Sequence, residues 1–488
     1  MVRMSWMIMI LAGGLLAAGC PCNCEQADDA GEPDNGVPEV DAGDTPEPET
    51  TPSDVKETVS LALVVDDLGD GAVGAGTEED PYRDLQFAID QCDDGGTILI
   101  KEGTYSATPQ PYADPGCGNC PDATFYDGSV ATRGFLVTGK SVHLEGVGQQ
   151  ETILVTNAGY GLLFDDAGDS SVQNLKVTGG VRDADGKATD AGIVVLHTKL
   201  LVEDVSVVGN DNLYTGPEPD PVVGVGGIFG REGSDLTIKN CVVQDNSWDG
   251  ITLYRGLPGD ASTSPVAHVE GNRVGCNSQC VNPRGRGAGI ATTWDSSMVA
   301  IGNEVFRYWK GIGAFGDSTM ILHNNVVRDQ GGWGVIVTGY ATMYAYNNVV
   351  TRNGTTGMSA WNVGTKGAFV NNIIYANGTS PDEWVGKKAG LWMNTTAPAF
   401  TLRYNLVFEN ADEDACFGGL PDPNPEPCIP LDTVGTDGNI AGDPLFLGPN
   451  DFHLKEGSPA IDAGDPTLFD PDESRSDMGI YGGTHGLQ

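Results

Sequence analysis

The sequence predicts an all-β solenoid, in which short strands wind into coils that stack along one axis. A unit of the form apolar, any residue, Asn or Asp, any residue, apolar recurs, and from Asn303 to Asn372 its anchors follow at gaps of 22, 23 and 24 residues. Glycine supplies 69 of the 488 residues, and each interior glycine costs a helix about 1 kcal/mol. A period in the twenties with short β runs is typical of a solenoid. The anchors are Asn174, Asp204, Asn240, Asn272, Asn303, Asn325, Asn348, Asn372 and Asn405.

The N-terminus predicts export. The apolar run from Met7 to Gly19 is shorter than the roughly 20 residues that span a bilayer, so residues 1–19 are interpreted as a signal peptide. Its end, Leu16-Ala17-Ala18-Gly19-Cys20, resembles the bacterial lipobox. The resemblance implies cleavage before Cys20, acylation of Cys20 and a lipid anchor in the cell envelope, with Pro21 favouring the outer membrane or cell surface. The alternative is an ordinary secretory signal with a chance cysteine.

Residues 20–58 are predicted to be a disordered tether. Positions 21–58 carry twelve acids and one base, together with many Pro, Gly and Thr and no aromatic residue. Such a stretch cannot bury enough apolar surface to order itself, and its like charges extend it.

One amphipathic helix is expected early in the body of the chain. Asp80 is a favourable N-cap and Pro81 a favourable first helical residue. The turn Asp94-Gly95-Gly96 ends the helix, and residues 97–100 form a short strand. The apolar face of the helix comprises Tyr82, Leu85, Ala88, Ile89 and Cys92.

Beyond this strand, each coil is expected to bury its inward Val, Ile and Leu only against neighbouring coils. The repeated Asn belongs at a turn, where its amide can bond along the stack from coil to coil. Several anchors are followed by a glycine and an apolar residue, as in Gly311-Ile312 and Gly334-Val335. A pair of β-sandwiches also gives frequent turn signals, but it does not give an Asn-anchored period of 22–24.

The chain resembles the right-handed parallel β-helix proteins of the pectate-lyase-like class. The resemblance lies in Gly76–Tyr82, in Lys101-Glu102-Gly103-Thr104-Tyr105, and in the closing runs Asp443–Phe446, Ser458–Gly464 and Asp477–Gly482. It implies a β-helix with an N-terminal cap over residues 59–442 and a closing segment over residues 443–488. It implies no single activity, because this fold hosts lyases, hydrolases, epimerases and non-catalytic adhesins.

Eleven cysteines in an exported chain favour disulfides over zinc ligation. Cys117 lies near Cys120 and Cys276 near Cys280, while Cys416 and Cys428 bracket a Pro-rich loop. The bridges would close insertions at residues 106–130, 275–287 and 410–440. The connectivity stays open at this stage, since spacing does not decide it.

Charge and aromatic content point to residues 284–403 as a ligand-binding stretch. The chain carries a net charge of −42, which disfavours nucleic acid as a partner. The stretch itself has ten bases and six acids, a net of +4, and six of the eight tryptophans. Turn residues of adjacent coils align, so a row of indoles would offer a sugar-stacking surface next to cations. The alternative is that these aromatics pack under projecting loops. The candidate ligand-binding residues are Trp248, Trp309, Trp333, Trp361, Arg307 and Lys310.

A lyase of this fold class would need a cation to neutralise a uronate carboxylate and a base to remove the α-proton. It would often need Ca²⁺ as well. The cationic candidates are Arg284, Arg286, Lys387 and Lys388, and Ca²⁺ candidates are Asp249, Asp295, Asp465 and Asp470. Solvated side chains in Gly-rich loops and acidic turns are the alternative. The sequence has neither the Asn-Thr-Asp run nor the Gly-His-Gly run that polygalacturonase-like β-helices carry, which puts glycosidase activity in doubt.

The sequence therefore predicts an envelope-anchored, monomeric β-helix lipoprotein that binds a surface or extracellular polysaccharide. The second hypothesis is a polysaccharide lyase or other carbohydrate-active enzyme, and the third is a structural spacer without a ligand.

Overall fold

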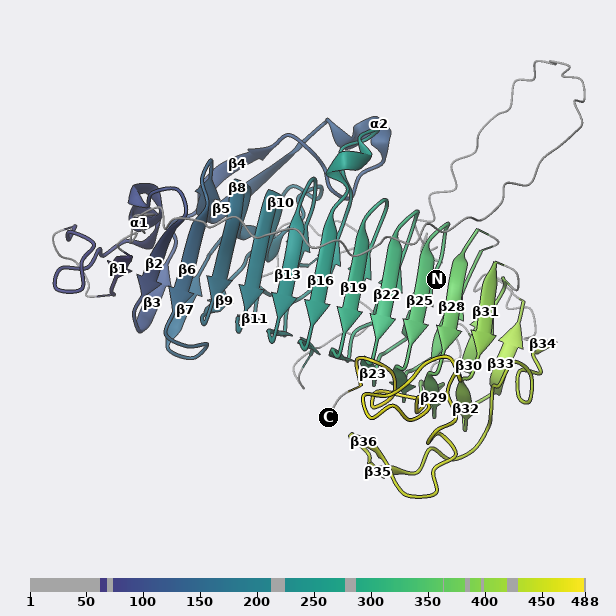
Figure 1. The fold of residues 1–488 in the computed structure, drawn as a ribbon. Helices are drawn as coiled ribbons and strands as arrows, with labels where there is room; N and C mark the ends of the chain where they lie inside the picture. The colour runs from purple at the N-terminus through teal and green to yellow at the C-terminus, as the bar shows by residue number, and fades with distance from the viewer. Residues whose placement is uncertain are drawn as a thin grey trace, which may run out of the picture. The chain divides into compact units, whose positions relative to one another are not determined.

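A computed structural model describes residues 62–67, 73–211, 224–276, 287–362, 364–381, 387–395, 399–418 and 429–486. Residues 59–488 form one compact unit, a solenoid of parallel strands (Figure 1). The predicted signal peptide and tether lie outside the described residues. The parallel ladders bear out the predicted solenoid and exclude the β-sandwich alternative.

Each coil contributes strands to three faces, which are numbered here in the order in which the chain visits them. Strands β8 (Tyr160–Gln173) and β10 (Ala191–Glu203) are long enough to run across faces 1 and 2. Face 1 continues with β5 (Ser129–Thr138), β12 (Gly226–Gly230), β15 (Ile251–Leu253), β18 (Ala288–Thr292), β21 (Lys310–Ala314), β24 (Trp333–Val337), β27 (Met358–Ala360), β30 (Ala389–Met393) and β33 (Glu413–Phe417).

Face 2 follows across a turn and pairs in register from coil to coil. It comprises β1 (Leu63–Val65), β2 (Gly96–Ile100), β6 (Val142–Gly146), β13 (Asp235–Lys239), β16 (Val266–Glu270), β19 (Ser297–Ile301), β22 (Thr319–His323), β25 (Thr342–Tyr346), β28 (Lys366–Val370) and β31 (Phe400–Arg403). Face 3 comprises β3 (Gly103–Ser106), β7 (Thr152–Val155), β9 (Lys176–Thr178), β11 (Ser206–Val208), β14 (Val242–Gln244), β17 (Arg273–Gly275), β20 (Glu304–Phe306), β23 (Val326–Arg328), β26 (Val349–Thr351), β29 (Ile373–Tyr375) and β32 (Leu406–Phe408).

The core is a column of aliphatic side chains inside the coils. Ile251 and Leu253 of face 1, for example, share it with Val243 and Val274 of face 3, and all four are fully buried. The N-terminal end of the column is covered by α1 (Leu85–Gln91), whose Leu85, Ala88 and Ile89 are buried as predicted.

The predicted N-cap of this helix is wrong. Asp84, not Asp80, caps α1 and accepts from the backbone N–H of Phe87 at 2.7 Å. The backbone of Tyr82 is already paired with β1, donating to Val64 at 2.9 Å and accepting from Asp66 at 3.0 Å. A residue held in that ladder cannot also be helical, so the helix begins later.

The repeated asparagines form a ladder along the stack, as predicted. The Asn272 side-chain Nδ2 donates to Asn303 Oδ1 at 2.9 Å, and the Asn303 Nδ2 donates to Asn325 Oδ1 at 2.9 Å. The ladder continues through Asn348, Asn372, Asn405 and Asn439. It satisfies amides in the turn before face 3, where each is buried.

Three predicted anchors do not belong to this ladder. Register places Asn174, Asp204 and Asn240 one position earlier, and they adopt left-handed φ values of 55°, 53° and 52°. Gly271 and Gly302 take the same position in the next coils. Asn, Asp and Gly all tolerate this conformation. Asn therefore occurs both at this left-handed position and at the ladder position that follows it, and the sequence pattern does not distinguish the two.

A row of glycines and a second asparagine ladder mark the turn before face 1. Asn353 Nδ2 donates to Asn377 Oδ1 and Asn377 Nδ2 donates to Asn410 Oδ1, each at 2.9 Å. A Cβ on Gly334 would lie 2.6 Å from Asn353 Nδ2 and 2.5 Å from the Gly357 oxygen. The glycines leave room for the amides and for the next coil. The row is Gly134, Gly161, Gly192, Gly227, Gly250, Gly289, Gly311, Gly334, Gly357 and Gly390.

The C-terminal segment packs against the outer side of face 3. It includes β35 (Phe446–Gly448) and β36 (Asp451–Leu454), and its Phe452, Met478 and Ile480 join an apolar cluster with face 3. Asn324 Nδ2 donates to the Ile480 and Gly482 oxygens at 2.9 and 2.8 Å. The left-handed turn position thus anchors this segment.

The first of the loops predicted as insertions, residues 106–130, projects from the coils (Figure 1), whereas most of 275–287 and residues 419–428 lie outside the described residues. The first contains β4 (Gln110–Asp114), which pairs antiparallel with β5, and α2 (Asp122–Phe125), with a disulfide between Cys117 and Cys120. A short η1 (Ala261–Thr263) lies in another loop, and β34 (Ile429–Pro430) pairs antiparallel with β33. Cys276 and Cys416 are also disulfide-bonded, whereas Cys92 and Cys241 are buried free thiols. Cys280 and Cys428 lie outside the described residues.

Candidate functional site

Four tryptophans from consecutive coils contact one another on the outer side of face 1. Trp309 precedes β21, Trp333 begins β24, Trp361 follows β27 and Trp392 lies within β30. Their ring centroids are 5.8, 5.3 and 4.7 Å apart in that order. We call these four residues the tryptophan row.

The row is partly a packed structure and partly exposed. Successive rings meet edge to face, at interplanar angles of 87°, 82° and 66°. Trp392 is fully buried, and its Nε1 donates to the Gly418 oxygen at 2.9 Å. Trp309, Trp333 and Trp361 are half-buried. The buried end fixes the row, while the other indoles keep part of their surface in contact with solvent.

Trp248 is not part of the row. It packs against a separate apolar cluster that includes Tyr160, Phe229 and Tyr254, under the N-terminal loops. Trp248 and Trp309 both precede a member of the glycine row, but the coil between them has Gly287 at the equivalent position.

Asp249 and Lys310 form an electrostatically coupled pair at the start of the row. Asp249 is buried, accepts from the Ala288 N–H at 2.7 Å and from the Thr252 hydroxyl at 3.2 Å. Burial raises the pKa of Asp249 to about 6, against the opposing charge of Lys310. Burial also lowers the pKa of Lys310, whose Nζ lies 5.9 Å from the Phe315 ring centroid. Neighbouring ionisable groups whose pKa values are shifted by burial occur at functional sites more often than elsewhere.

The other basic candidates are dispersed. Arg307 is exposed and adopts a left-handed φ of 59°. Lys387 and Lys388 immediately precede β30, beside the buried end of the row. Arg284 and Arg286 lie outside the described residues.

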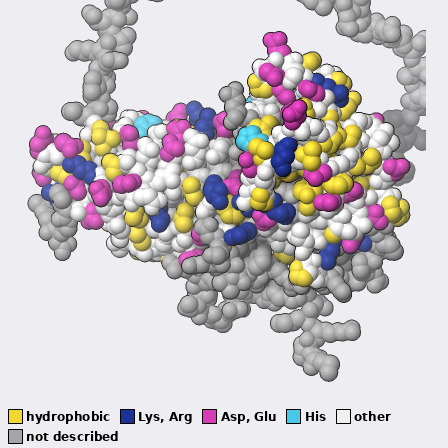
Figure 2. Space-filling view, turned by 90° about the horizontal axis from the view of Figure 1, so that it is seen from below, with side chains coloured by type: hydrophobic (Ala, Val, Ile, Leu, Met, Phe, Trp, Pro, Cys, Tyr) yellow, Lys and Arg dark blue, Asp and Glu magenta, His cyan; other side chains and the backbone are white. Residues whose placement is uncertain are grey.

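Several basic residues in the middle of the chain form ion pairs with acidic residues on face 3. Arg328 contacts Glu304 at 2.6 Å and Asp329 at 2.5 Å, and Arg352 contacts Asp329 at 2.8 Å. Figure 2 shows Lys and Arg side chains intermixed with Asp and Glu side chains on the side seen from below. The basic stretch therefore does not act as one continuous patch for a ligand.

The candidate Ca²⁺ ligands are held by hydrogen bonds within the protein. Asp295 accepts from the Gly256 N–H at 3.0 Å and the Ser264 hydroxyl at 2.7 Å. Asp465 and Asp470 likewise accept from backbone N–H groups, at 3.0 Å from Thr467 and Asp477 respectively. Asp249 lies beside the start of β18 and Asp295 beyond its end. Across the part of the chain that the structure describes, no group of three His, Cys, Asp or Glu residues could hold a metal ion.

A buried ionic cluster that was not predicted from the sequence lies under the N-terminal loops. Arg231 Nη1 contacts Asp114 at 2.5 Å and the Tyr160 and Thr189 hydroxyls at 3.1 and 2.9 Å, and Nη2 contacts Glu232 at 3.0 Å. Arg231 is fully buried. These residues come from separate coils and loops, so no local motif links them.

Two hollows lie away from the tryptophan row. One, of about 530 Å³, lies beside α1 and includes Arg83, Phe87 and Arg133. The other, of about 430 Å³, lies between face 2 and the C-terminal segment and includes Tyr344, Tyr346 and Arg403.

The family model described as "Right handed beta helix region" matches residues 191–374 and 295–420. The fold of the chain is that of a right-handed parallel β-helix, as the sequence predicted. No curated protein matches it in sequence.

Among solved structures, the chain is similar to pectate lyase Pel9A, with 16% identity, a TM-score of 0.43, and coverage of 86% of this chain and 96% of that one. It is also similar to the periplasmic alginate epimerase AlgG (12%, TM-score 0.37, 69% and 80% covered) and to the catalytic domain of a GH87 α-1,3-glucanase in complex with nigerose (10%, TM-score 0.38, 78% and 64% covered). Within the described ranges, none of the helices has the length and apolar character needed to cross a membrane.

Proposed function

We propose that this protein is an envelope-anchored lipoprotein that binds a surface or extracellular polysaccharide along face 1. The tryptophan row is the observation that carries the proposal. Its half-buried members present indole surface at successive coils, and the apolar faces of sugar rings pack on such aromatic surfaces. The repeat of the row suits a polymer, whose units also repeat.

Substitution of the exposed end of the row tests this proposal. Trp309→Ala combined with Trp333→Ala should weaken binding of the recognised glycan by about tenfold or more, equivalent to about 1.4 kcal/mol. Binding of the full chain to a panel of neutral glycans and polyuronates would be measured by calorimetry. Tyr126→Ala is the matched control, because Tyr126 is 66% exposed and lies in the N-terminal loop.

Two results would contradict the proposal. If the panel does not bind the parent, the spacer reading is favoured. If the double variant binds as the parent does, the row is only a packing feature. The melting temperature of each variant, measured alongside, separates lost binding from lost folding.

A polysaccharide lyase or related enzyme is the second candidate, and the Asp249–Lys310 pair favours it. A carboxylate with a pKa raised to about 6 suits proton transfer near neutral pH, and burial lowers the pKa of the lysine in the same pair. Incubation with polyuronates and Ca²⁺ tests this, because elimination creates an unsaturated product that absorbs ultraviolet light. Activity that Lys310→Met abolishes would support the enzyme; a flat trace for the parent on every polymer would exclude a lyase for those substrates.

The lipid anchor at Cys20 is part of the same proposal. We expect acylated Cys20 to begin the mature chain and to hold it in the outer membrane or at the cell surface. Mass spectrometry of the mature N-terminus and fractionation of a Cys20→Ser variant test this. A Cys20→Ser variant that stays in the membrane fraction would contradict it.

A further inference from the structure

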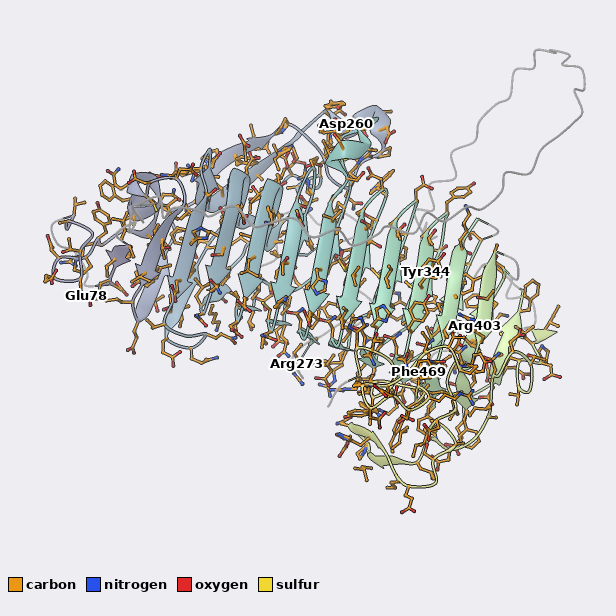
Figure 3. The ribbon with its side chains drawn as sticks, viewed as in Figure 1. Glu78, Asp260, Arg273, Tyr344, Arg403 and Phe469 are labelled. Carbon is orange, nitrogen blue, oxygen red and sulfur yellow. A yellow bond between two sulfur atoms is a disulfide. The ribbon has the colours of Figure 1, made fainter. Side chains whose placement is uncertain are left out.

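A groove between face 2 and the C-terminal segment has the composition of a ligand site. Its volume is about 430 Å³, within the range of small-ligand sites. The face 2 side is formed by β22, β25 and β31, and the opposite side by the C-terminal segment. Figure 3 shows Tyr344 on face 2 and Arg403 close to the C-terminal segment that carries Phe469. The lining residues are Ile321, His323, Asn324, Tyr344, Tyr346, Asn347, Arg403, Leu468, Gly483 and Thr484.

The register of the coils arranges aromatic rings next to one cation. His323 pairs with Tyr346, and Tyr346 aligns through Val370 with Arg403. Adjacent coils are about 4.8 Å apart, so Arg403 lies about two coil spacings from Tyr346. The His323 and Tyr346 rings are stacked, with centroids 5.2 Å apart and an interplanar angle of 13°.

The rings leave an apolar surface open to solvent. Tyr344 is 38% exposed, and it pairs in register with Ile321 of the preceding coil. Burial, together with His485, lowers the pKa of His323 to about 4, so this ring is neutral at pH 7. The floor of the groove is therefore uncharged and aromatic.

The charge of the groove is set by Arg403. Its side chain is 47% exposed, and one Nη contacts Asp465 at 3.0 Å. Asp465 is 2% exposed, and its other carboxylate oxygen, Oδ1, accepts from the Thr467 hydroxyl at 2.8 Å. A guanidinium has five N–H donors, so this contact leaves donors for an anion. The described residues that line the groove include no Asp or Glu, although the chain as a whole is strongly acidic.

We infer that this groove is a second saccharide site, which takes an acidic sugar unit with its ring against Tyr344 and its carboxylate at Arg403. Arginine binds carboxylates through paired N–H donors, and its planar fork favours a carboxylate over a neutral hydroxyl. The site uses none of the residues of the tryptophan row. It would give the protein a second point of contact with a polyuronate, and two linked contacts raise the apparent affinity for a polymer.

The test compares two short probes, a galacturonic acid trimer and a neutral galactose trimer, on the full chain. We expect the parent to bind the acidic trimer more tightly. Tyr344→Ala should weaken binding of the acidic trimer by about tenfold. Arg403→Gln should remove the preference for the acidic trimer. Tyr340→Ala and Lys366→Gln are the matched controls, since both residues are exposed and neither lines the groove.

The outcomes separate this site from the tryptophan row. Acidic-trimer binding that survives Trp309→Ala with Trp333→Ala but falls with Tyr344→Ala supports the groove even if the proposed function fails. Parent binding that is absent, indifferent to charge, or unchanged by Tyr344→Ala overturns the inference. Tyr344 is exposed, so its variant remains informative if Arg403→Gln destabilises the C-terminal segment.

Discussion

The side-chain Nδ2 of Asn325 and its backbone N–H both donate to one oxygen, Oδ1 of Asn348, at 3.0 and 2.9 Å. The same two bonds link Asn303 to Asn325 and Asn348 to Asn372. Each amide therefore satisfies the turn of the preceding coil. This relationship explains why the repeat demands Asn, since no other side chain of this length offers both an acceptor and two donors.

The two adjacent turn positions should differ in how well they tolerate glycine. Asn272→Gly removes the acceptor for the buried Cys241 N–H and the donor to the Ile238 oxygen, so it should lower the free energy of unfolding by about 2–4 kcal/mol. Asn240→Gly should change it by only a few tenths, because Asn240 has a φ of 52° that glycine accepts readily. Denaturant unfolding measures both. Equal losses for the two variants would contradict the assignment of these positions.

The glycine row should not tolerate a methyl group. In Gly334→Ala the new Cβ would lie 2.5 Å from the Gly357 oxygen, so we expect a loss of about 1–3 kcal/mol from overpacking. Gly186→Ala is the control, because a Cβ there has open space around it. A melting temperature of Gly334→Ala that matches the control would show that the coils can shift apart without cost.

Arg231 should be essential to the N-terminal loops. Arg231→Ala leaves the carboxylates of Asp114 and Glu232 buried without their partner, which typically costs about 3–5 kcal/mol. Hydrogen exchange should lose protection around β4 and α2 before the coils of β19 to β25 are affected. Tyr160→Phe, which removes one hydroxyl from the same cluster, should cost about 1 kcal/mol. Retained protection of β4 in Arg231→Ala would contradict this role.

Asp190 should make the protein less stable as the pH rises. Asp190 is 1% exposed, and burial raises its pKa to about 7 despite its 2.5 Å contact with Arg182. The folded chain therefore holds a proton that the unfolded chain releases above about pH 4. The stability from this group is full below pH 4 and is lost as the pH approaches 7.

Asp190→Asn keeps the shape and stays neutral, so its stability relative to the parent should increase between pH 5 and pH 8. Unfolding free energies of both proteins at the two pH values measure this difference. Asp260→Asn is the control, since Asp260 lies exposed in a turn and its pKa is lowered by hydrogen bonds from Ser262. A parallel pH dependence of Asp190→Asn and the parent would show that Asp190 is ionised in the folded chain.

Only part of the candidate site could be predicted from the sequence. Trp309 and Trp333 could be aligned because they share a place in a regular period, and the structure brings them together. Trp361 was named without a place in the row, and Trp392 was not among the candidates, because insertions change the spacing of their coils. Asp249 and Lys310 were assigned to different roles, yet stacking couples them across an intervening coil. The groove at Tyr344 and Arg403 was not foreseen, since one of its sides comes from the C-terminal segment.

By itself the sequence determined the solenoid, the capping helix and the Asn ladder, because these follow from short-range periodicity and from residue types with few alternative uses. The tertiary structure alone decided which Asn residues form the ladder and which take the left-handed turn position. It also decided where α1 begins and which side chains meet across coils. Those outcomes depend on register, and a shift of one residue changes the conformation and the partners of every side chain in a turn. They also depend on the C-terminal segment, whose contacts with Asn324 join residues more than 150 positions apart.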